Sequence, residues 1–128
     1  MATVRGDFVH QVETISGENL LSCNQCGKCS AGCPLAFSMD LLPNQVIRLV
    51  QLGIEDVLLS QTIWTCASCL TCSSRCPKGL ELPRLMEALR IISLQEDGNR
   101  LEADQISPER LAEMPQLAII GGFRKYSA

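Results

Sequence analysis

Three features of the sequence predict an all-α fold. Residues 42–53 and 82–95 carry apolar side chains at helical spacing, and each segment opens with a Leu-Pro pair, which suits the first turn of a helix. Each segment follows a run of cysteines, so the order of elements repeats after about forty residues. Between the two runs, no stretch alternates apolar and polar residues around tight glycine turns, as β-hairpins would.

A short helix is expected first, over residues 7–16, with Asp7 as the candidate N-cap and Gly17 as the candidate stop. Its apolar side is formed by Phe8, Val9, Val12 and Ile15. The next helix is expected to begin near Pro43 and to end at Gly53. Its apolar face is formed by Leu42, Val46, Leu49 and Val50.

The second half of the chain follows the same plan. A helical turn is expected at residues 55–59, and Trp64 is expected to pack in the core beside the second run of cysteines. After that run, a helix should extend from Leu82 to about Gln95. The buried side of this helix is predicted to consist of Leu82, Leu85, Met86, Leu89 and Ile92.

The composition changes after residue 98, which divides the chain into a predicted domain, residues 1–98, and an extension, residues 99–128. In the extension, Ser107 is the candidate N-cap of a helix that Pro115 limits to about two turns. The apolar end of the chain shows no helical length. Because an apolar terminus must be buried somewhere, either on its own domain or on another protein, we interpret the extension as a tail that docks onto a partner.

All eight cysteines lie in two runs of identical spacing, Cys-x2-Cys-x2-Cys-x3-Cys-Pro. The same spacing holds 4Fe-4S clusters in two-cluster ferredoxins of the bacterial kind, in which the cysteine before the proline binds the cluster of the other run. The predicted cofactors are therefore two 4Fe-4S clusters. Applied to this chain, the rule predicts one cluster on Cys23, Cys26, Cys29 and Cys76, and a second on Cys66, Cys69, Cys72 and Cys33.

Other uses of the cysteines are disfavoured. A structural zinc ion takes four ligands in pairs, so the third cysteine spacing in each run would have no role in a zinc site. Disulfides are disfavoured because the first residues carry charges and no apolar signal-peptide segment, so a cytoplasmic protein with reduced thiols is expected. No stretch approaches the ~18 consecutive apolar residues of a membrane span.

Charge and composition also restrict the function. The formal charge of −3 would become roughly −7 with two clusters, each about −2, which disfavours nucleic acid as a partner. The pair Gly121-Gly122 does not follow a strand that leads into a helix, so no nucleotide-binding fingerprint is present. Eight thiolates would occupy every iron of two cubanes, which leaves no iron open to a substrate. We therefore expect electron transfer and no catalytic residues.

The chain resembles the C subunit of heterodisulfide reductases and of their bacterial relatives over nearly its whole length. The resemblance is carried by the two cysteine runs, the segment Pro-Asn-Gln-Val-Ile-Arg-Leu-Val-Gln-Leu-Gly between them, the Trp64-Thr65-Cys66 sequence and the tail around residues 121–125. The cysteine pattern alone is shared with other α-helical ferredoxins, which include the iron–sulfur subunits of succinate and fumarate dehydrogenases and of glycolate oxidase.

The resemblance implies an α-helical ferredoxin fold and an electron-transfer subunit of a hetero-oligomeric complex. Two partners are implied, namely a subunit that carries flavin and iron–sulfur clusters, and a cysteine-rich subunit that is catalytic. The resemblance also implies that all eight cysteines bind the clusters. Two alternatives are an iron–sulfur subunit of a respiratory dehydrogenase that feeds quinone, and a freely diffusing ferredoxin. The chain shows no plant-type cluster domain like that of succinate dehydrogenases, which argues against the first alternative. A freely diffusing ferredoxin would gain nothing from an apolar tail, which argues against the second.

Overall fold

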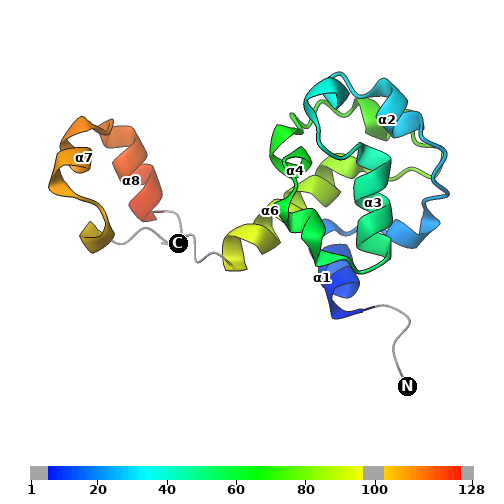
Figure 1. Cartoon of the computed structure of the whole chain (residues 1–128), viewed down its shortest axis with the longest axis horizontal. Coiled ribbons are helices and arrows are strands. Elements are labelled where there is room, and N and C mark those ends of the chain that lie inside the picture. Colours follow the sequence, from blue (N-terminus) through cyan, green and yellow to red (C-terminus); the bar gives the residue numbers. More distant parts are fainter. Residues whose placement is uncertain (1–5, 97–102, 125–128) are drawn as a thin grey trace. The chain divides into compact units, whose positions relative to one another are not determined.

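The computed structural model describes residues 6–96 and 103–124, and within these ranges it contains helices and no strand, which confirms the predicted all-α fold (Figure 1). The chain separates into two compact units, Met1–Ser93 and Leu94–Ala128, called here the N-terminal and the C-terminal unit. The division predicted after residue 98 lies outside the described residues. None of the described helices has both the length and the apolar character that crossing a bilayer requires.

The first helix, α1 (Asp7–Ser16), ends where the sequence predicts. Gly17 follows it with φ 73°, in the left-handed region that glycine adopts without strain. The predicted N-cap is wrong by one residue, because Gly6 occupies that position and Asp7 lies in the first turn. There its carboxylate still interacts favourably with the positive end of the helix dipole. Phe8, Val9 and Val12 are buried, whereas Ile15 is exposed.

Helix α3 (Pro43–Gln51) is the centre of the N-terminal unit, where it contacts α1 and the short helices η1 (Leu20–Ser22) and η3 (Glu55–Leu59) (Figure 1). Pro43 begins the helix as predicted, and the side chain of Gln45 accepts a hydrogen bond from the Leu42 N–H at 2.8 Å. The buried face differs from the prediction: Ile47 is buried, Leu42 is exposed, and Leu49 is only partly buried.

Helix α6 (Leu82–Glu96) completes the core of the N-terminal unit. Every residue predicted for its buried side is at most 2% exposed: Leu82, Leu85, Met86, Leu89 and Ile92. These side chains belong to one apolar cluster with residues of α1, α3 and η3. Burying a leucine or isoleucine contributes about 1.5–3 kcal/mol, so this cluster is the main apolar contribution to the stability of the unit.

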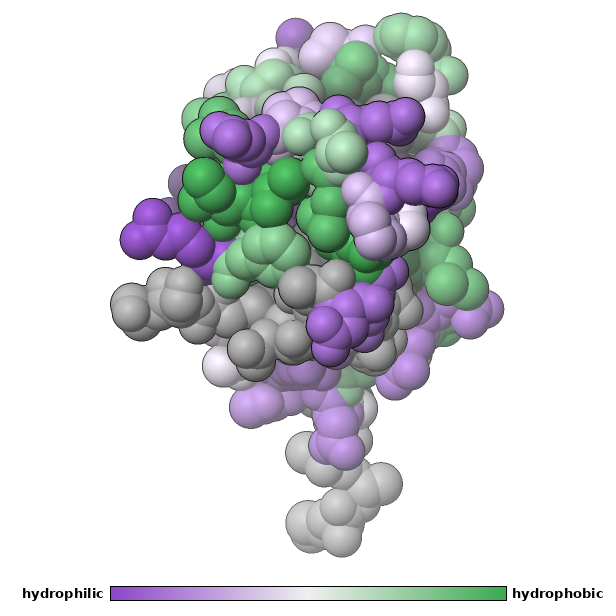
Figure 2. Space-filling view, turned by 90° about the vertical axis from the view of Figure 1, so that its left-hand side faces the viewer, coloured by the Kyte–Doolittle hydropathy of each residue, from purple (hydrophilic) through white to green (hydrophobic). Residues whose placement is uncertain are grey.

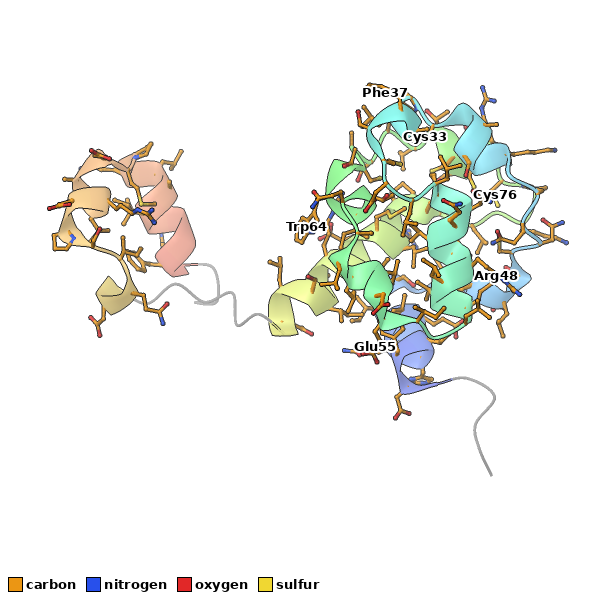
Figure 3. All side chains as sticks on the ribbon, in the orientation of Figure 1. Cys33, Phe37, Arg48, Glu55, Trp64 and Cys76 are labelled. Atoms are coloured by element: carbon orange, nitrogen blue, oxygen red, sulfur yellow. The ribbon has the colours of Figure 1, made fainter. Side chains whose placement is uncertain are left out.

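The prediction for Trp64 is wrong. Helix α4 (Thr62–Thr65) is a single turn that immediately precedes the second cysteine run. It buries Thr62 and Ile63, whereas the Trp64 side chain is 48% exposed and lies on the outside of the N-terminal unit (Figure 3). A single turn presents only part of its circumference to the core, and here the β-branched pair occupies that part.

The N-terminus of α4 is capped by the carboxylate of Asp40, which lies in the loop after the first cysteine run. This carboxylate accepts hydrogen bonds from the Gln61 N–H at 3.0 Å, from the Thr62 N–H at 3.0 Å and from the Thr62 hydroxyl at 2.7 Å. These bonds favour the ionised form and lower the pKa of Asp40 from 3.8 to about 2. The loop after the first run is thereby attached to the helix that leads into the second run.

We expect replacement of Asp40 by alanine to lower the free energy of unfolding by about 1 kcal/mol, as the loss of an N-cap does. Because the native pKa of Asp40 is lowered to about 2, its stabilisation is complete above about pH 4 and is lost only as the pH falls further. The destabilisation should therefore be the same throughout the neutral range. Anaerobic chemical denaturation measures it, with Asp56→Ala, an exposed acidic residue of η3, as the matched control. Equal stability of the two variants would contradict the capping role.

The C-terminal unit contains η4 (Ala103–Gln105), α7 (Pro108–Glu113) and α8 (Gln116–Arg124). Helix α7 begins after Ser107 and stops before Pro115, as predicted, although the Ser107 side chain makes no capping hydrogen bond. The prediction that no helix follows Pro115 is wrong. The Pro115 carbonyl accepts hydrogen bonds from the N–H groups of Ala118 and Ile119 and so starts α8.

Candidate metal centre

The two cysteine runs fold into nearly the same backbone. Each contains one short helix, α2 (Lys28–Gly32) in the first run and α5 (Thr71–Arg75) in the second. The residue before each helix is in the left-handed region, with φ 78° and ψ 2° at Gly27 and φ 65° and ψ 4° at Leu70. After each helix, the cysteine that precedes proline is extended, as expected for a residue in that position. The repeat in the sequence is thus also a repeat in structure.

Helices α2 and α5 pack directly against each other. The contact includes Gly32, where an added Cβ atom would lie 2.6 Å from Cδ of the Arg75 side chain and would displace that side chain. This contact places the end of each run beside the other run. The cysteine that leaves each helix therefore faces the cysteines of the opposite run.

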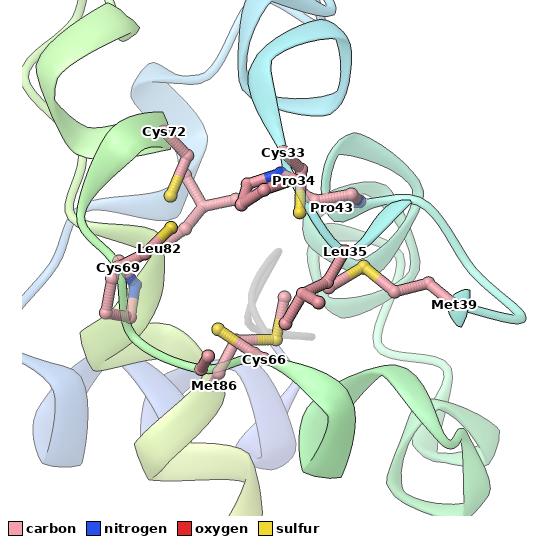
Figure 4. Close-up of a pocket in the computed structure, with 12 residues that line it drawn as sticks. Cys33, Pro34, Leu35, Met39, Pro43, Cys66, Cys69, Cys72, Leu82 and Met86 are labelled. Atoms are coloured by element: carbon pink, nitrogen blue, oxygen red, sulfur yellow. The ribbon is translucent and has the colours of Figure 1, made fainter. Parts of the chain in front are cut away.

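Two pockets result, and each is lined by four cysteines. The first, called pocket A, is lined by Cys23, Cys26, Cys29 and Cys76. The second, called pocket B, is lined by Cys66, Cys69, Cys72 and Cys33 (Figure 4). In both pockets, three thiols come from one run and the fourth is the cysteine before proline of the other run. Among the described residues, no three Cys, His, Asp or Glu side chains converge tightly enough to share a single metal ion. The four sulfurs of pocket B instead surround an open space (Figure 4).

The walls of the two pockets differ in polarity. Besides its cysteines, pocket B is lined by apolar side chains, which include Leu35, Met39, Leu82 and Met86 (Figure 4). Pocket A is also lined by polar side chains, namely Asn24, Gln25, Asn44 and Lys78. The empty volumes, which include space open to solvent, are about 400 Å³ for pocket B and about 330 Å³ for pocket A.

The third cysteines of the two runs share one electrostatic environment. Burial raises the pKa of Cys29 and of Cys72, which are the third cysteines of their runs. At Cys69, in contrast, the hydroxyl and then the N–H of Thr71 lower the pKa of the thiol. A metal ligand must be a thiolate, so binding at Cys29 and Cys72 requires a positive charge that offsets the cost of a buried anion.

Two side chains that the sequence analysis missed hold the first cysteine of each run. The amide of Gln51 on α3 donates to the carbonyl oxygens of Leu20 at 2.6 Å and of Cys23 at 3.5 Å. In the second run, Arg90 on α6 donates to the carbonyl oxygen of Cys66 at 2.5 Å and also to that of Ile63. Both are polar residues on helices whose other inward positions are apolar, and this is the signal that could have revealed them.

The donor set fits 4Fe-4S clusters. Each cubane takes four thiolates, and each pocket offers four cysteines. N–H groups also reach the sulfurs, since the Gln25 backbone N–H lies 3.4 Å from Sγ of Cys23. Such hydrogen bonds are the usual surroundings of cluster sulfurs.

Comparison with known proteins supports the same chemistry. Residues 19–80 match the family described as a 4Fe-4S dicluster domain. The chain is 35% identical over 100 residues to the iron-sulfur C 2 subunit of the CoB–CoM heterodisulfide reductase of Methanocaldococcus jannaschii, a match that covers 72% of this chain and 54% of the relative. It is 38% identical over 77 residues to the C2 subunit of the H(2)/formate:CoB-CoM heterodisulfide,ferredoxin reductase of Methanococcus maripaludis, with coverage of 60% and 42%.

A third relative is the C subunit of the ferredoxin:CoB-CoM heterodisulfide reductase of Methanosarcina acetivorans, which is 35% identical over 91 residues, or 71% of this chain and 36% of the relative. The matched part thus spans about half the length of these relatives or less. The domain match and the relatives support an iron–sulfur protein with a role in electron transfer. Residues 19–80 are thus similar to a 4Fe-4S dicluster domain, and the chain is similar in sequence to the C subunits of heterodisulfide reductases.

Proposed function

We propose that this chain is an electron-transfer subunit that holds two 4Fe-4S clusters, one in pocket A and one in pocket B. The observation that carries the proposal is the lining of each pocket by three cysteines of one run and the pre-proline cysteine of the other. When bound, a 4Fe-4S cluster accepts and releases single electrons at a potential set by its surroundings. The ligands would be Cys23, Cys26, Cys29 and Cys76 in pocket A, and Cys66, Cys69, Cys72 and Cys33 in pocket B.

The number of cysteines supports electron transfer rather than catalysis. Two cubanes present eight iron positions, and the two pockets together present eight thiols. No iron would be left to bind a substrate. The packing of α2 on α5 supports a relay for a second reason, because both runs contribute to both pockets and the two clusters would therefore be neighbours.

We further propose that electrons pass between a flavin-containing iron–sulfur subunit and a cysteine-rich catalytic subunit of a heterodisulfide-reductase-like complex. The names of the relatives support this assignment, because each is one subunit of a heterodisulfide reductase.

The residues of the C-terminal extension, 99–128, would dock onto the complex. Leu117 is 83% exposed and Ile120 is 51% exposed on α8, and apolar side chains gather on the face drawn in Figure 2. Exposed apolar patches commonly mark protein interfaces.

The test is anaerobic affinity purification of the chain from its native host, followed by identification of the proteins that accompany it. A flavoprotein and a cysteine-rich protein should be recovered with the wild-type chain. Leu117→Ser should weaken this association roughly thirty-fold, because burying a leucine contributes about 2 kcal/mol. The matched control is Leu59→Ser, which changes a leucine of the N-terminal unit that is also 83% exposed.

Three outcomes would contradict the proposal. Recovery with a quinone-reducing dehydrogenase would favour the respiratory alternative, and recovery without partners would favour a free ferredoxin. Equal loss of association in the two leucine variants would contradict docking through α8. Iron and sulfide analysis of every sample shows whether the clusters themselves are unaffected.

A further inference from the structure

The two cysteine runs share a backbone but differ in their hydrogen bonds to sulfur. Gln25 and Ser68 occupy corresponding positions between the first and second cysteines, and both are in the left-handed region, with φ 59° and 54°. Gln25 donates twice to Sγ of Cys23, from its backbone N–H at 3.4 Å and from its side-chain Nε2 at 3.5 Å. Among the hydrogen bonds of the described residues, none joins Ser68 to a cysteine sulfur.

We propose that Gln25 raises the reduction potential of the cluster in pocket A above that of the cluster in pocket B. The inference rests on the proposed function, since it requires a cluster in each pocket. Reduction adds one negative charge to a cluster, and part of this charge resides on the thiolate sulfurs. Two N–H donors at one sulfur stabilise the added charge, so pocket A should be reduced first.

The walls of the pockets favour the same order. Asn24, Asn44 and Lys78 bring dipoles and a cation to pocket A, and these stabilise additional negative charge. Pocket B is enclosed by Leu35, Met39 and other apolar side chains, and low-polarity surroundings disfavour an increase in charge. Hydrogen bonding and polarity should therefore both raise the reduction potential of pocket A relative to that of pocket B.

Two groups near pocket B should raise the reduction potential of its cluster, but their effect is weaker. The guanidinium of Arg90 donates to backbone carbonyls and not to sulfur, and Oε2 of Glu87 lies 3.4 Å from its Nη1, which offsets its charge. The Thr71 hydroxyl lies 3.4 Å from Sγ of Cys69 and can donate one hydrogen bond to the thiolate. One hydroxyl donor at pocket B stands against two N–H donors at pocket A.

The experiment is an anaerobic redox titration of the cluster-loaded full-length protein, followed by electron paramagnetic resonance. The wild type should show two reduction waves. Gln25→Leu removes the side-chain donor, and it should shift the upper wave to lower potential while the lower wave stays in place. Leucine can adopt a positive φ in this fold, because Leu70, at the position of the second run that matches Gly27, has φ 65°. Ser68→Gln places the donor in the second run and should raise the lower wave.

A shift of the lower wave by Gln25→Leu, or a shift of neither wave, would overturn the inference. A shift of the upper wave by Ser68→Gln would overturn it as well, and this variant tests the proposal even where Gln25→Leu does not fold. Iron and sulfide are measured in the same samples. A wild-type protein that binds fewer than two cubanes would instead refute the proposed function, and the inference with it.

Discussion

Replacement of Cys33 by alanine should empty pocket B and leave the cluster in pocket A, although Cys33 belongs to the run that supplies three ligands of pocket A. The physical reason is the extended backbone of Cys33, which leaves α2 and turns its thiol toward Cys66, Cys69 and Cys72 (Figure 4). Loss of one of four thiolates leaves an iron without its ligand. We expect bound iron and acid-labile sulfide to fall to about half.

Double variants identify which cluster is lost. Cys26 and Cys69 are the exposed second cysteines of their runs and form a matched pair. If Cys33 and Cys69 bind the same cluster, Cys33→Ala with Cys69→Ala should lose no more iron than either single variant, whereas Cys33→Ala with Cys26→Ala should lose nearly all of it. The reverse pattern would mean that each run binds its own cluster. Iron and sulfide analysis after anaerobic reconstitution provides the measurement.

Removal of iron should unfold the N-terminal unit. Helices α2 and α5 have five residues each, far below the roughly 12–15 residues at which isolated helices become marginally stable. Within the two runs, Cys29 is the only buried cysteine, so these segments bring little apolar area of their own to the core. Because cluster binding and folding are coupled, the free energy of binding is part of the free energy of folding.

Treatment with a chelator and a reductant should therefore abolish most of the helical signal in far-ultraviolet circular dichroism and increase the hydrodynamic radius. Anaerobic addition of iron and sulfide should restore both. An apoprotein that keeps its dichroism and its compact size would show that the cluster of apolar residues from α1, α3 and α6 folds without metal. The dichroism of the untreated Cys33→Ala variant, which should keep only the cluster in pocket A, shows whether one cluster alone maintains the fold.

Much of the fold could be predicted because it depends on local spacing. The helix from Leu82 and the stop at Gly17 follow from periodicity and from the conformational preference of one residue. Trp64 could not be placed in this way, because a one-turn helix has no periodicity to show which side is buried. The apolar end of the chain shows no helical length in the sequence, yet local hydrogen bonds to the Pro115 carbonyl begin a helix there.

The candidate site divides in the same manner. The spacing of the cysteines by itself determined the chemistry of the ligands, because thiols three residues apart on a tightly wound segment can face one cluster. The spacing also predicted, by the ferredoxin rule, which pocket each pre-proline cysteine lines. Only the tertiary structure showed how this pairing is reached, namely through the packing of α2 against α5. It also decided the roles of Gln51 and Arg90, which reach the cysteine runs from helices distant in the chain, and of Gln25, whose side-chain conformation turns its amide toward Cys23.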